Sequence, residues 1–216
     1  MTTALASAGA DIVSIELPND PGSENTSKIV KSCGRKYSSY ECDVSNLKSI
    51  RSTYQKIWSD GVKADIVLNC AGVQRRAEAA DFTDEDIDAV IDINIKATLV
   101  SCQEFAKKNL AEGRPGKVIN IASIISFIGG KNITPYAASK GGVMQVTKAM
   151  SNEWAEKGYV LNNTNTRQNS DGSASIQCNS IHPGYFRTAM TEQYSTGEKT
   201  FSRYVFGLTK HSWAKC

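Results

Sequence analysis

The chain of 216 residues is long enough for one well-buried domain or two small ones, and its 40% apolar and 22% charged residues are an ordinary balance for a globular protein. Acidic and basic residues nearly cancel to a formal net charge of +3 without a long basic run, so no nucleic-acid partner is expected. The longest strongly apolar run, 118–130, is shorter than the roughly 20 residues that cross a bilayer, so no membrane segment is expected.

The first residues, "MTTALASAGAD", lack the basic start of a secretory signal peptide, which favours a cytoplasmic protein. The cysteines form no Cys-x-x-Cys pair and have no matching histidine spacing, so we expect reduced thiols and no metal site. We interpret Cys70 as a buried structural thiol. Of the two histidines, neither is given a catalytic role, and His182 is expected to pack before a Pro-Gly turn. The cysteines stand at positions 33, 42, 70, 102, 178 and 216.

Short β-branched runs alternate along the chain with longer helical patterns. This alternation predicts a doubly wound α/β domain with a parallel sheet and right-handed crossovers. Thr83 followed by three acidic residues is typical of a helix start. Predicted strands lie at 11–17, 36–42, 64–70, 116–123 and 175–181, and predicted helices at 23–33, 46–59, 83–111 and 135–157.

One segment of the sequence, 162–175, breaks this alternation. It reads "NNTNTRQNSDGSAS" and is rich in Asn, Ser and Thr, so it is interpreted as an inserted flexible loop.

Three polar residues near the middle of the chain form a candidate catalytic set. In a helix that begins near Pro135, Tyr136 and Lys140 lie one turn apart on the same face. A nearby cation favours the phenolate, so Lys140 is expected to lower the pKa of Tyr136 and make it usable as a proton donor or acceptor. Ser123 follows a predicted strand, where open α/β sheets bind their ligands. The alternative for the Tyr-x-x-x-Lys spacing alone is an ordinary pair on an amphipathic helix.

The order and spacing of four motifs resemble the short-chain dehydrogenase/reductase family. They are "DIVLNCAGV" (65–73), "NIAS" (120–123), "YAASK" (136–140) and "HPGYFRT" (182–188). The resemblance covers residues 1 to about 160, and again about 176 to 194. It implies a Rossmann-like sheet, a bound nicotinamide dinucleotide and hydride transfer to or from a substrate carbon.

The resemblance also implies a role for each motif residue. Tyr136 is the general acid/base, and Lys140 lowers its pKa and holds the nicotinamide ribose. Ser123 orients the substrate oxygen, while Asn94 supports a proton-relay water. Further cofactor contacts are implied for Glu16, Asp43, Val44, Asn69, Ala71, Gly72, Pro183, Gly184 and Thr188.

The end of the first predicted strand bears on the choice of cofactor. Glu16 stands where an acidic side chain accepts hydrogen bonds from the adenosine ribose 2′-hydroxyl, and its charge repels a 2′-phosphate. NAD is therefore expected in preference to NADP. The alternative is an exposed glutamate at a strand end with no ligand.

Residues 71–97 resemble, within the family, the 2-deoxy-D-gluconate 3-dehydrogenase and gluconate 5-dehydrogenase branch. The paired Arg75 and Arg76 carry much of this likeness, and either is able to bind a sugar-acid carboxylate in a bidentate pair. Solvated surface arginines are the alternative. The expected partner is thus a small sugar acid or polyol, and the resemblance also implies a homo-oligomer.

Two departures from the family pattern modify these expectations. The family begins with a strand and a glycine-rich turn, whereas this sequence starts inside the following helix, and residues 195–216 no longer resemble the family. We therefore expect one incomplete dinucleotide-binding domain over 1–194 that lacks the first strand and the last strand. The sheet should keep a gap between strands 11–17 and 64–70, or close it by pairing them. A second function class stays open: a catalytically inactive fragment or non-enzymatic paralogue unable to bind the dinucleotide.

Overall fold

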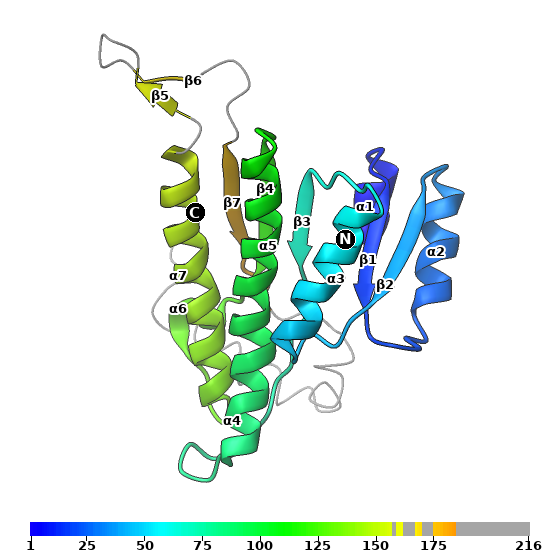
Figure 1. The fold of residues 1–216 in the computed structure, drawn as a ribbon. Coiled ribbons are helices and arrows are strands. Elements are labelled where there is room, and N and C mark those ends of the chain that lie inside the picture. Colours follow the sequence, from blue (N-terminus) through cyan, green and yellow to red (C-terminus); the bar gives the residue numbers. More distant parts are fainter. Residues whose placement is uncertain (157–158, 162–166, 170–174, 185–216) are drawn as a thin grey trace, which may run out of the picture.

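The computed structural model describes residues 1–156, 159–161, 167–169 and 175–184. Each predicted strand has a counterpart within these residues, each predicted helical stretch is helical over most of its length, and the predicted α/β class is confirmed (Figure 1). The strands are β1 (Ile12–Glu16), β2 (Tyr37–Glu41), β3 (Ile66–Asn69), β4 (Gly116–Ile121) and β7 (Ile176–Ile181). The main helices are α2 (Ser23–Ser32), α3 (Leu47–Ser59), α4 (Asp84–Ile91), α5 (Thr98–Ala111) and α7 (Thr134–Glu156).

The strands form two parallel blocks. In the first, β1 pairs with β2, and in the second, β4 lies between β3 and β7. The arrows of β1, β3 and β7 point the same way in Figure 1, so both blocks present their carboxyl ends at one edge. Among the described strands, β1 does not pair with β3. Of the two expected outcomes, the gap is the one observed.

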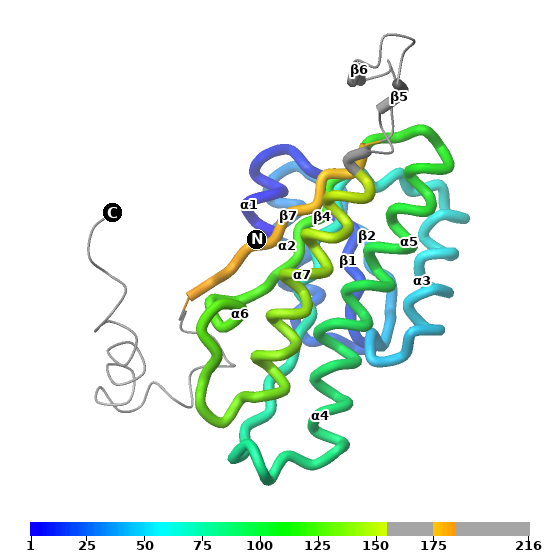
Figure 2. The backbone as a smooth tube through the Cα atoms, turned by 90° about the vertical axis from the view of Figure 1, so that its left-hand side faces the viewer, coloured from blue at the N-terminus to red at the C-terminus, as the bar shows by residue number. Residues whose placement is uncertain are grey.

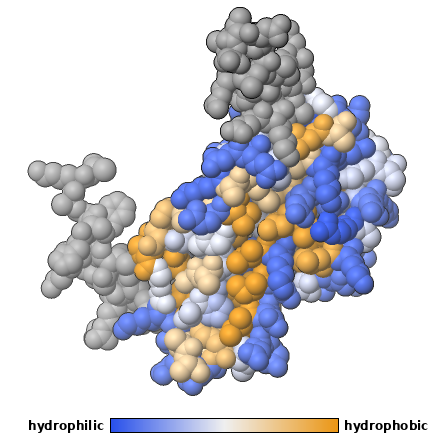
Figure 3. Space-filling model, turned by 60° about the vertical axis from the view of Figure 1, so that its left-hand side comes forward, coloured by the Kyte–Doolittle hydropathy of each residue, from blue (hydrophilic) through white to orange (hydrophobic). Residues whose placement is uncertain are grey.

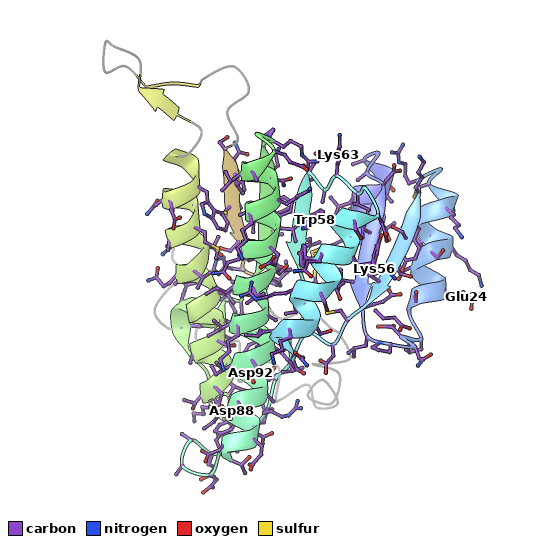
Figure 4. The ribbon with its side chains drawn as sticks, in the orientation of Figure 1. Glu24, Lys56, Trp58, Lys63, Asp88 and Asp92 are labelled. Atoms are coloured by element: carbon purple, nitrogen blue, oxygen red, sulfur yellow. The ribbon has the colours of Figure 1, made fainter. Side chains whose placement is uncertain are left out.

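A groove with a volume of about 1060 Å³ occupies the gap between the two blocks. Its walls come from the facing edges of β1 and β3, and side chains of α3, including Trp58, close one side (Figure 4). Val13 and Ile66 are exposed, although continuous apolar strands of this class are normally covered on both faces. Within the described ranges neither β1 nor β3 has a neighbouring strand on its groove side, so no adjoining side chains from such a strand cover Val13 and Ile66.

The hydrophobic core lies between the β3–β4–β7 block and the helices that cover it. Phe105, Val118 and Ile176 are fully buried and belong to one cluster, which Ile50 of α3 and Trp154 of α7 also join. Figure 3 shows apolar side chains in a band between polar margins on the side formed by the long helices. None of the helices in the described ranges is long and apolar enough to cross a membrane.

The predicted helix 83–111 is not one continuous α-helix. Thr83 caps α4 as expected, since its side chain accepts a hydrogen bond from the amide of Asp86 at 3.2 Å. Between α4 and α5, however, Asp92–Ala97 forms a π-helical turn, η1. Single π-turns inside α-helices occur frequently at functional sites.

Three shorter elements complete the described chain. Helix α1 (Thr2–Ser7) agrees with the expectation that the sequence begins inside a helix, and α6 (Ile125–Ile128) follows β4. The prediction of a loop over 162–175 is wrong in part, because β6 (Arg167–Asn169) pairs antiparallel with β5 (Tyr159–Leu161). Backbone pairing needs no apolar side chains, so composition alone did not reveal this strand.

Candidate active site

The candidate site lies where the second block of strands ends. β4 leads directly into Ser123 and α6, β7 leads into residues 182–184, and α7 begins nearby with Tyr136 in its first turn. Figure 2 shows α6 beside the first turns of α7 and near the end of β7. The sequence motifs around 123, 136 and 182 therefore meet at the carboxyl edge of the sheet.

Ser123 and Tyr136 are brought together as the sequence predicted. Ser123 is buried, and its hydroxyl accepts a hydrogen bond from the amide of Ile125 at 3.2 Å. Burial raises the pKa of the Tyr136 hydroxyl, and a hydrogen bond with Ser123 lowers it in part. The pKa of Tyr136 is thus raised in the protein alone, contrary to the expected lowering. The cause is that desolvation disfavours the phenolate more than one hydroxyl stabilises it.

Lys140 is buried one turn further along α7. Its Nζ lies 5.7 Å from the centroid of the Tyr136 ring and donates a hydrogen bond of 2.6 Å to the carbonyl oxygen of Ile121. Burial lowers the pKa of Lys140 to about 8. Its ammonium group is therefore near the tyrosine but is directed at the end of β4.

Asn94 lies on the π-helical turn and is almost fully buried. Its Oδ1 accepts from the Val73 amide at 2.8 Å, and its Nδ2 donates to the Val73 carbonyl at 3.0 Å and to Ser139 Oγ at 2.9 Å. The side chain thus fixes the loop after β3. A Cβ atom on Gly72 would lie 3.3 Å from Asn94 Oδ1 and 3.6 Å from Lys140 Nζ, so a side chain here would crowd the Asn94 amide.

Glu16 ends β1 within a cluster of hydroxyl groups. Ser14 and Tyr37 donate to Oε2 at 2.9 and 3.1 Å, and Ser23 donates to Oε1 at 2.5 Å. Desolvation raises the pKa of Glu16, but the hydrogen bonds outweigh it and leave the pKa lowered. The carboxylate is therefore ionised near neutrality, and its oxygens already accept hydrogen bonds from hydroxyl groups of the same chain.

The other predicted cofactor residues of the first two strands and β3 lie in different environments. Asp43 is exposed and accepts from the amide and hydroxyl of Ser45, and these bonds lower its pKa. Val44 packs against the core. Asn69 turns its side chain inward, donating to Asn120 Oδ1 at 2.8 Å and accepting from Ser101 at 2.6 Å.

The interpretation of Cys70 as a buried thiol is wrong. Cys70 is exposed and lines the groove between β1 and β3, as does Ala71. Among the described strands none pairs with β3 on that side, so Cys70 and Ala71 border the open groove.

The predicted substrate arginines lie on the loop after β3. Arg75 is exposed and forms an ion pair with Asp86, with 3.1 Å between Nε and Oδ1, whereas Arg76 is half-buried. Pro183 is half-buried and Gly184 is exposed beyond β7. Thr188 lies outside the described residues.

Sequence reasoning gave two side chains next to Ser123 no part in the site. His182 Nδ1 lies 3.1 Å from the Ser123 carbonyl oxygen, and the Ser126 hydroxyl accepts from the Ser123 amide at 3.3 Å and donates to the Lys140 carbonyl at 2.8 Å. The position of His182 directly after β7 was the available signal, since the ends of neighbouring parallel strands meet at one edge.

Comparison with known proteins agrees with this geometry. The family model described as short chain dehydrogenase matches residues 1–199. The 2-dehydro-3-deoxy-D-gluconate 5-dehydrogenase of Escherichia coli K12 is 34% identical over 99% of this chain and 76% of its own length. The gluconate 5-dehydrogenase of Gluconobacter oxydans is 31% identical over 90% of this chain and 69% of its own length.

A solved structure supports the same likeness. It is a gluconate 5-dehydrogenase from Burkholderia cenocepacia in complex with NADP and tartrate, with a TM-score of 0.78 and 28% identity. The match covers 94% of this chain and 72% of that one.

Proposed function

This chain belongs to the short-chain dehydrogenase family and to its sugar-acid branch, and from that premise we propose that it transfers a hydride between a nicotinamide dinucleotide and the CH–OH or C=O carbon of a small sugar acid or polyol. The observation that carries the proposal is the meeting of Ser123, Tyr136 and Lys140 at the carboxyl edge of the sheet. Asn94 supports them by fixing the loop after β3.

The proton chemistry follows from the surroundings of each group. The raised pKa of Tyr136 keeps its hydroxyl protonated near neutrality, so it is ready to donate a proton to a substrate carbonyl oxygen. Ser123 holds the same oxygen by a hydrogen bond. With a pKa of about 8, Lys140 is able to gain or lose a proton near physiological pH and supplies positive charge beside the tyrosine. For alcohol oxidation the direction of each proton transfer is reversed.

The residues present fit a dinucleotide. The ionised Glu16 carboxylate accepts hydrogen bonds from hydroxyl groups, and a ribose hydroxyl would replace one of these donors. Gly72 carries no side chain beside Lys140, which would let a ligand lie close to the main chain there. A bound nicotinamide supplies or accepts the hydride. Contacts from Asp43, Val44, Asn69, Ala71, Pro183, Gly184 and Thr188 belong to the same proposal.

For the cofactor, we propose NAD in preference to NADP, because the Glu16 charge opposes a 2′-phosphate. The Burkholderia relative was solved with NADP, so the two cofactors need to be compared directly.

For the substrate, we propose a sugar acid whose carboxylate is bound by Arg75 or Arg76. Both residues lie on the loop that Asn94 fixes, and the two relatives are dehydrogenases of 2-dehydro-3-deoxy-D-gluconate and of gluconate. Arg75 would take this role if a substrate carboxylate replaced Asp86 as the partner in its ion pair.

The test combines binding with turnover. We expect calorimetry to detect NADH binding, and NADH oxidation to occur with a panel of keto-sugar acids. Tyr136→Phe should retain NADH binding and lose about 10²- to 10⁴-fold in kcat, as expected for a general acid. Absence of NADH binding by a folded chain would instead support the non-enzymatic alternative, and equal turnover by Tyr136→Phe would contradict the proposed mechanism.

A further inference from the structure

The imidazole ring of His182 connects the end of β7 to the peptide of Ser123. Its Nδ1 lies 3.1 Å from the Ser123 carbonyl oxygen, and its Nε2 lies 2.8 Å from Ser180 Oγ. On one side the ring contacts Phe127, with 4.8 Å between ring centroids. The ring is thus held at both nitrogens and by a packing contact.

These partners determine where the ring proton lies. A carbonyl oxygen only accepts hydrogen bonds, so Nδ1 carries the proton and donates to Ser123. In the neutral ring Nε2 then accepts, and the Ser180 hydroxyl donates to it. Ser180 thereby selects the tautomer that is able to bond the Ser123 carbonyl.

We infer that His182 is a positioning residue that sets the place of the Ser123 hydroxyl relative to Tyr136; this inference rests on the proposed function of that site. Ser123 is the second residue after β4, and its neighbours are held to β7 by main-chain bonds: Ala122 to Ile181 at 2.8 Å and Ile124 to Pro183 at 3.0 Å. The Ser123 carbonyl accepts two hydrogen bonds, one from the His182 ring and one from the Ser126 amide at 2.9 Å, and the Ser123 amide donates to the Ser126 hydroxyl. His182 is therefore the contact that connects this carbonyl to the end of β7.

Loss of the His182 donor therefore acts on one peptide unit. The Ser123 carbonyl belongs to a buried residue, and without His182 it keeps only its hydrogen bond from the Ser126 amide in α6, so the peptide is able to rotate away from β7 toward that turn. Such a rotation displaces Ser123 Oγ from the Tyr136 hydroxyl. The pKa of Tyr136 then rises further, because the Ser123 hydrogen bond is what lowers it.

The test uses two substitutions that separate the donor from the ring. His182→Phe keeps a flat ring against Phe127 and removes the donor, whereas His182→Asn removes the ring and keeps an amide N–H near the position of Nδ1. Phe127→Leu is the matched control, since it removes the ring contact and leaves the hydrogen bond. Each variant is compared with the unchanged chain by thermal unfolding before other measurements.

Two readouts need no turnover. The ring-nitrogen NMR shifts of His182 should show a proton on Nδ1, and the ¹³Cζ resonance of Tyr136 at neutral pH should move in His182→Phe toward its position in Ser123→Ala. His182→Asn and Phe127→Leu should leave that resonance near its original position. A His182 proton on Nε2, or an unmoved Tyr136 resonance in His182→Phe, would overturn the inference even if the chain proves inactive.

The kinetic readout distinguishes positioning from general support of the fold. In His182→Phe we expect kcat to fall about 10- to 100-fold, with the alkaline limb of its pH profile displaced upward and the KM for the dinucleotide unchanged. His182→Asn should recover most of this loss. A His182→Asn variant as slow as His182→Phe, at equal thermal stability, would refute a role for the donor.

Discussion

The ammonium group of Lys140 donates a 2.6 Å hydrogen bond to the main-chain carbonyl of Ile121, the last residue of β4. A charged side chain from α7 thus binds the end of the strand that leads to Ser123. The exposed fraction of Lys140 is only 5%, and this burial lowers its pKa to about 8. The residue that supplies charge to the candidate site therefore also couples protonation to folding.

Replacement of Lys140 by Met should change how stability depends on pH. Between about 8 and 10.5 the unfolded chain keeps the lysine proton while the folded chain loses it, so the unfolding free energy of the unchanged protein rises with pH in this window. The rise should amount to about 3 kcal/mol and be absent in Lys140→Met. Lys148→Met, at an exposed position of the same helix, is the control. Urea unfolding at a series of pH values measures the unfolding free energy of the three proteins. Parallel plots of this free energy against pH would contradict the prediction.

Replacement of Glu16 by Gln should shift cofactor preference toward NADPH. The carboxylate repels a nearby phosphate by roughly 1 kcal/mol in water and about 4 kcal/mol near a protein surface. The ratio of the two dissociation constants should therefore change at least about fivefold, measured by calorimetry. Ser14→Ala, which removes one donor to Glu16 but no charge, should leave the ratio nearly constant. An unchanged ratio in Glu16→Gln would show that Glu16 has no part in cofactor choice.

Replacement of Arg75 by Ala should affect substrate binding more than stability. Its ion pair with Asp86 is exposed on both sides, so the unfolding free energy should change by less than about 1 kcal/mol. If the arginine binds the substrate carboxylate, the KM for a keto-sugar acid should rise about tenfold, while that for a polyol ketone without a carboxylate stays constant. Arg35→Ala, which breaks the pair with Asp11, is the matched control. Equal effects on both substrates would show that Arg75 is a surface arginine that does not bind the substrate carboxylate.

The gap in the sheet predicts an alternating pattern of amide hydrogen exchange. The Ile12 amide bonds Lys36 and the Lys117 amide bonds the Asp65 carbonyl, so alternate residues of β1 and β3 face the groove. Among these, Val13, Ile15, Ile66 and Leu68 should exchange faster than Ser14 and Val67, which face their paired strands. Slow exchange at both sets would show that the groove is closed or filled in solution.

The same open edges should make the chain prone to association. Unpaired strand edges are templates for pairing with other chains, and exposed Val13 and Ile66 add apolar surface there. We expect light scattering to show concentration-dependent aggregation and no activity in the aggregated material. A chain that stays monodisperse across the concentration series and unfolds in one sharp thermal transition would contradict this expectation.

The periodicity of the sequence was sufficient for the five strands of the two parallel blocks and for most of the long helices, because each is set by residues close together in the chain. It did not reveal α6, the β5–β6 pair or the π-helical turn. The meeting of Ser123 with Tyr136 was also predictable, since the carboxyl ends of parallel strands share one edge. The direction of the pKa shift of Tyr136 was not predictable, because it depends on the balance between burial and a hydrogen bond. Likewise, the exposure of Cys70 depends on a strand pairing that does not form.

The π-helical turn at Asp92–Ala97 puts the two ends of the long helical segment out of phase. A π-turn contains one more residue than an α-turn, so the apolar side of α5 is rotated by about 100° from where a continuous helix would place it. This shift lets α4 contact α7 while α5 contacts α3. A single-residue deletion within the turn would restore an unbroken helix. One of the two segments would then turn its contacting side chains toward solvent. Asn94 therefore lies on the turn whose additional residue sets the rotation of α5 relative to α4, and with it the helix that each of them contacts.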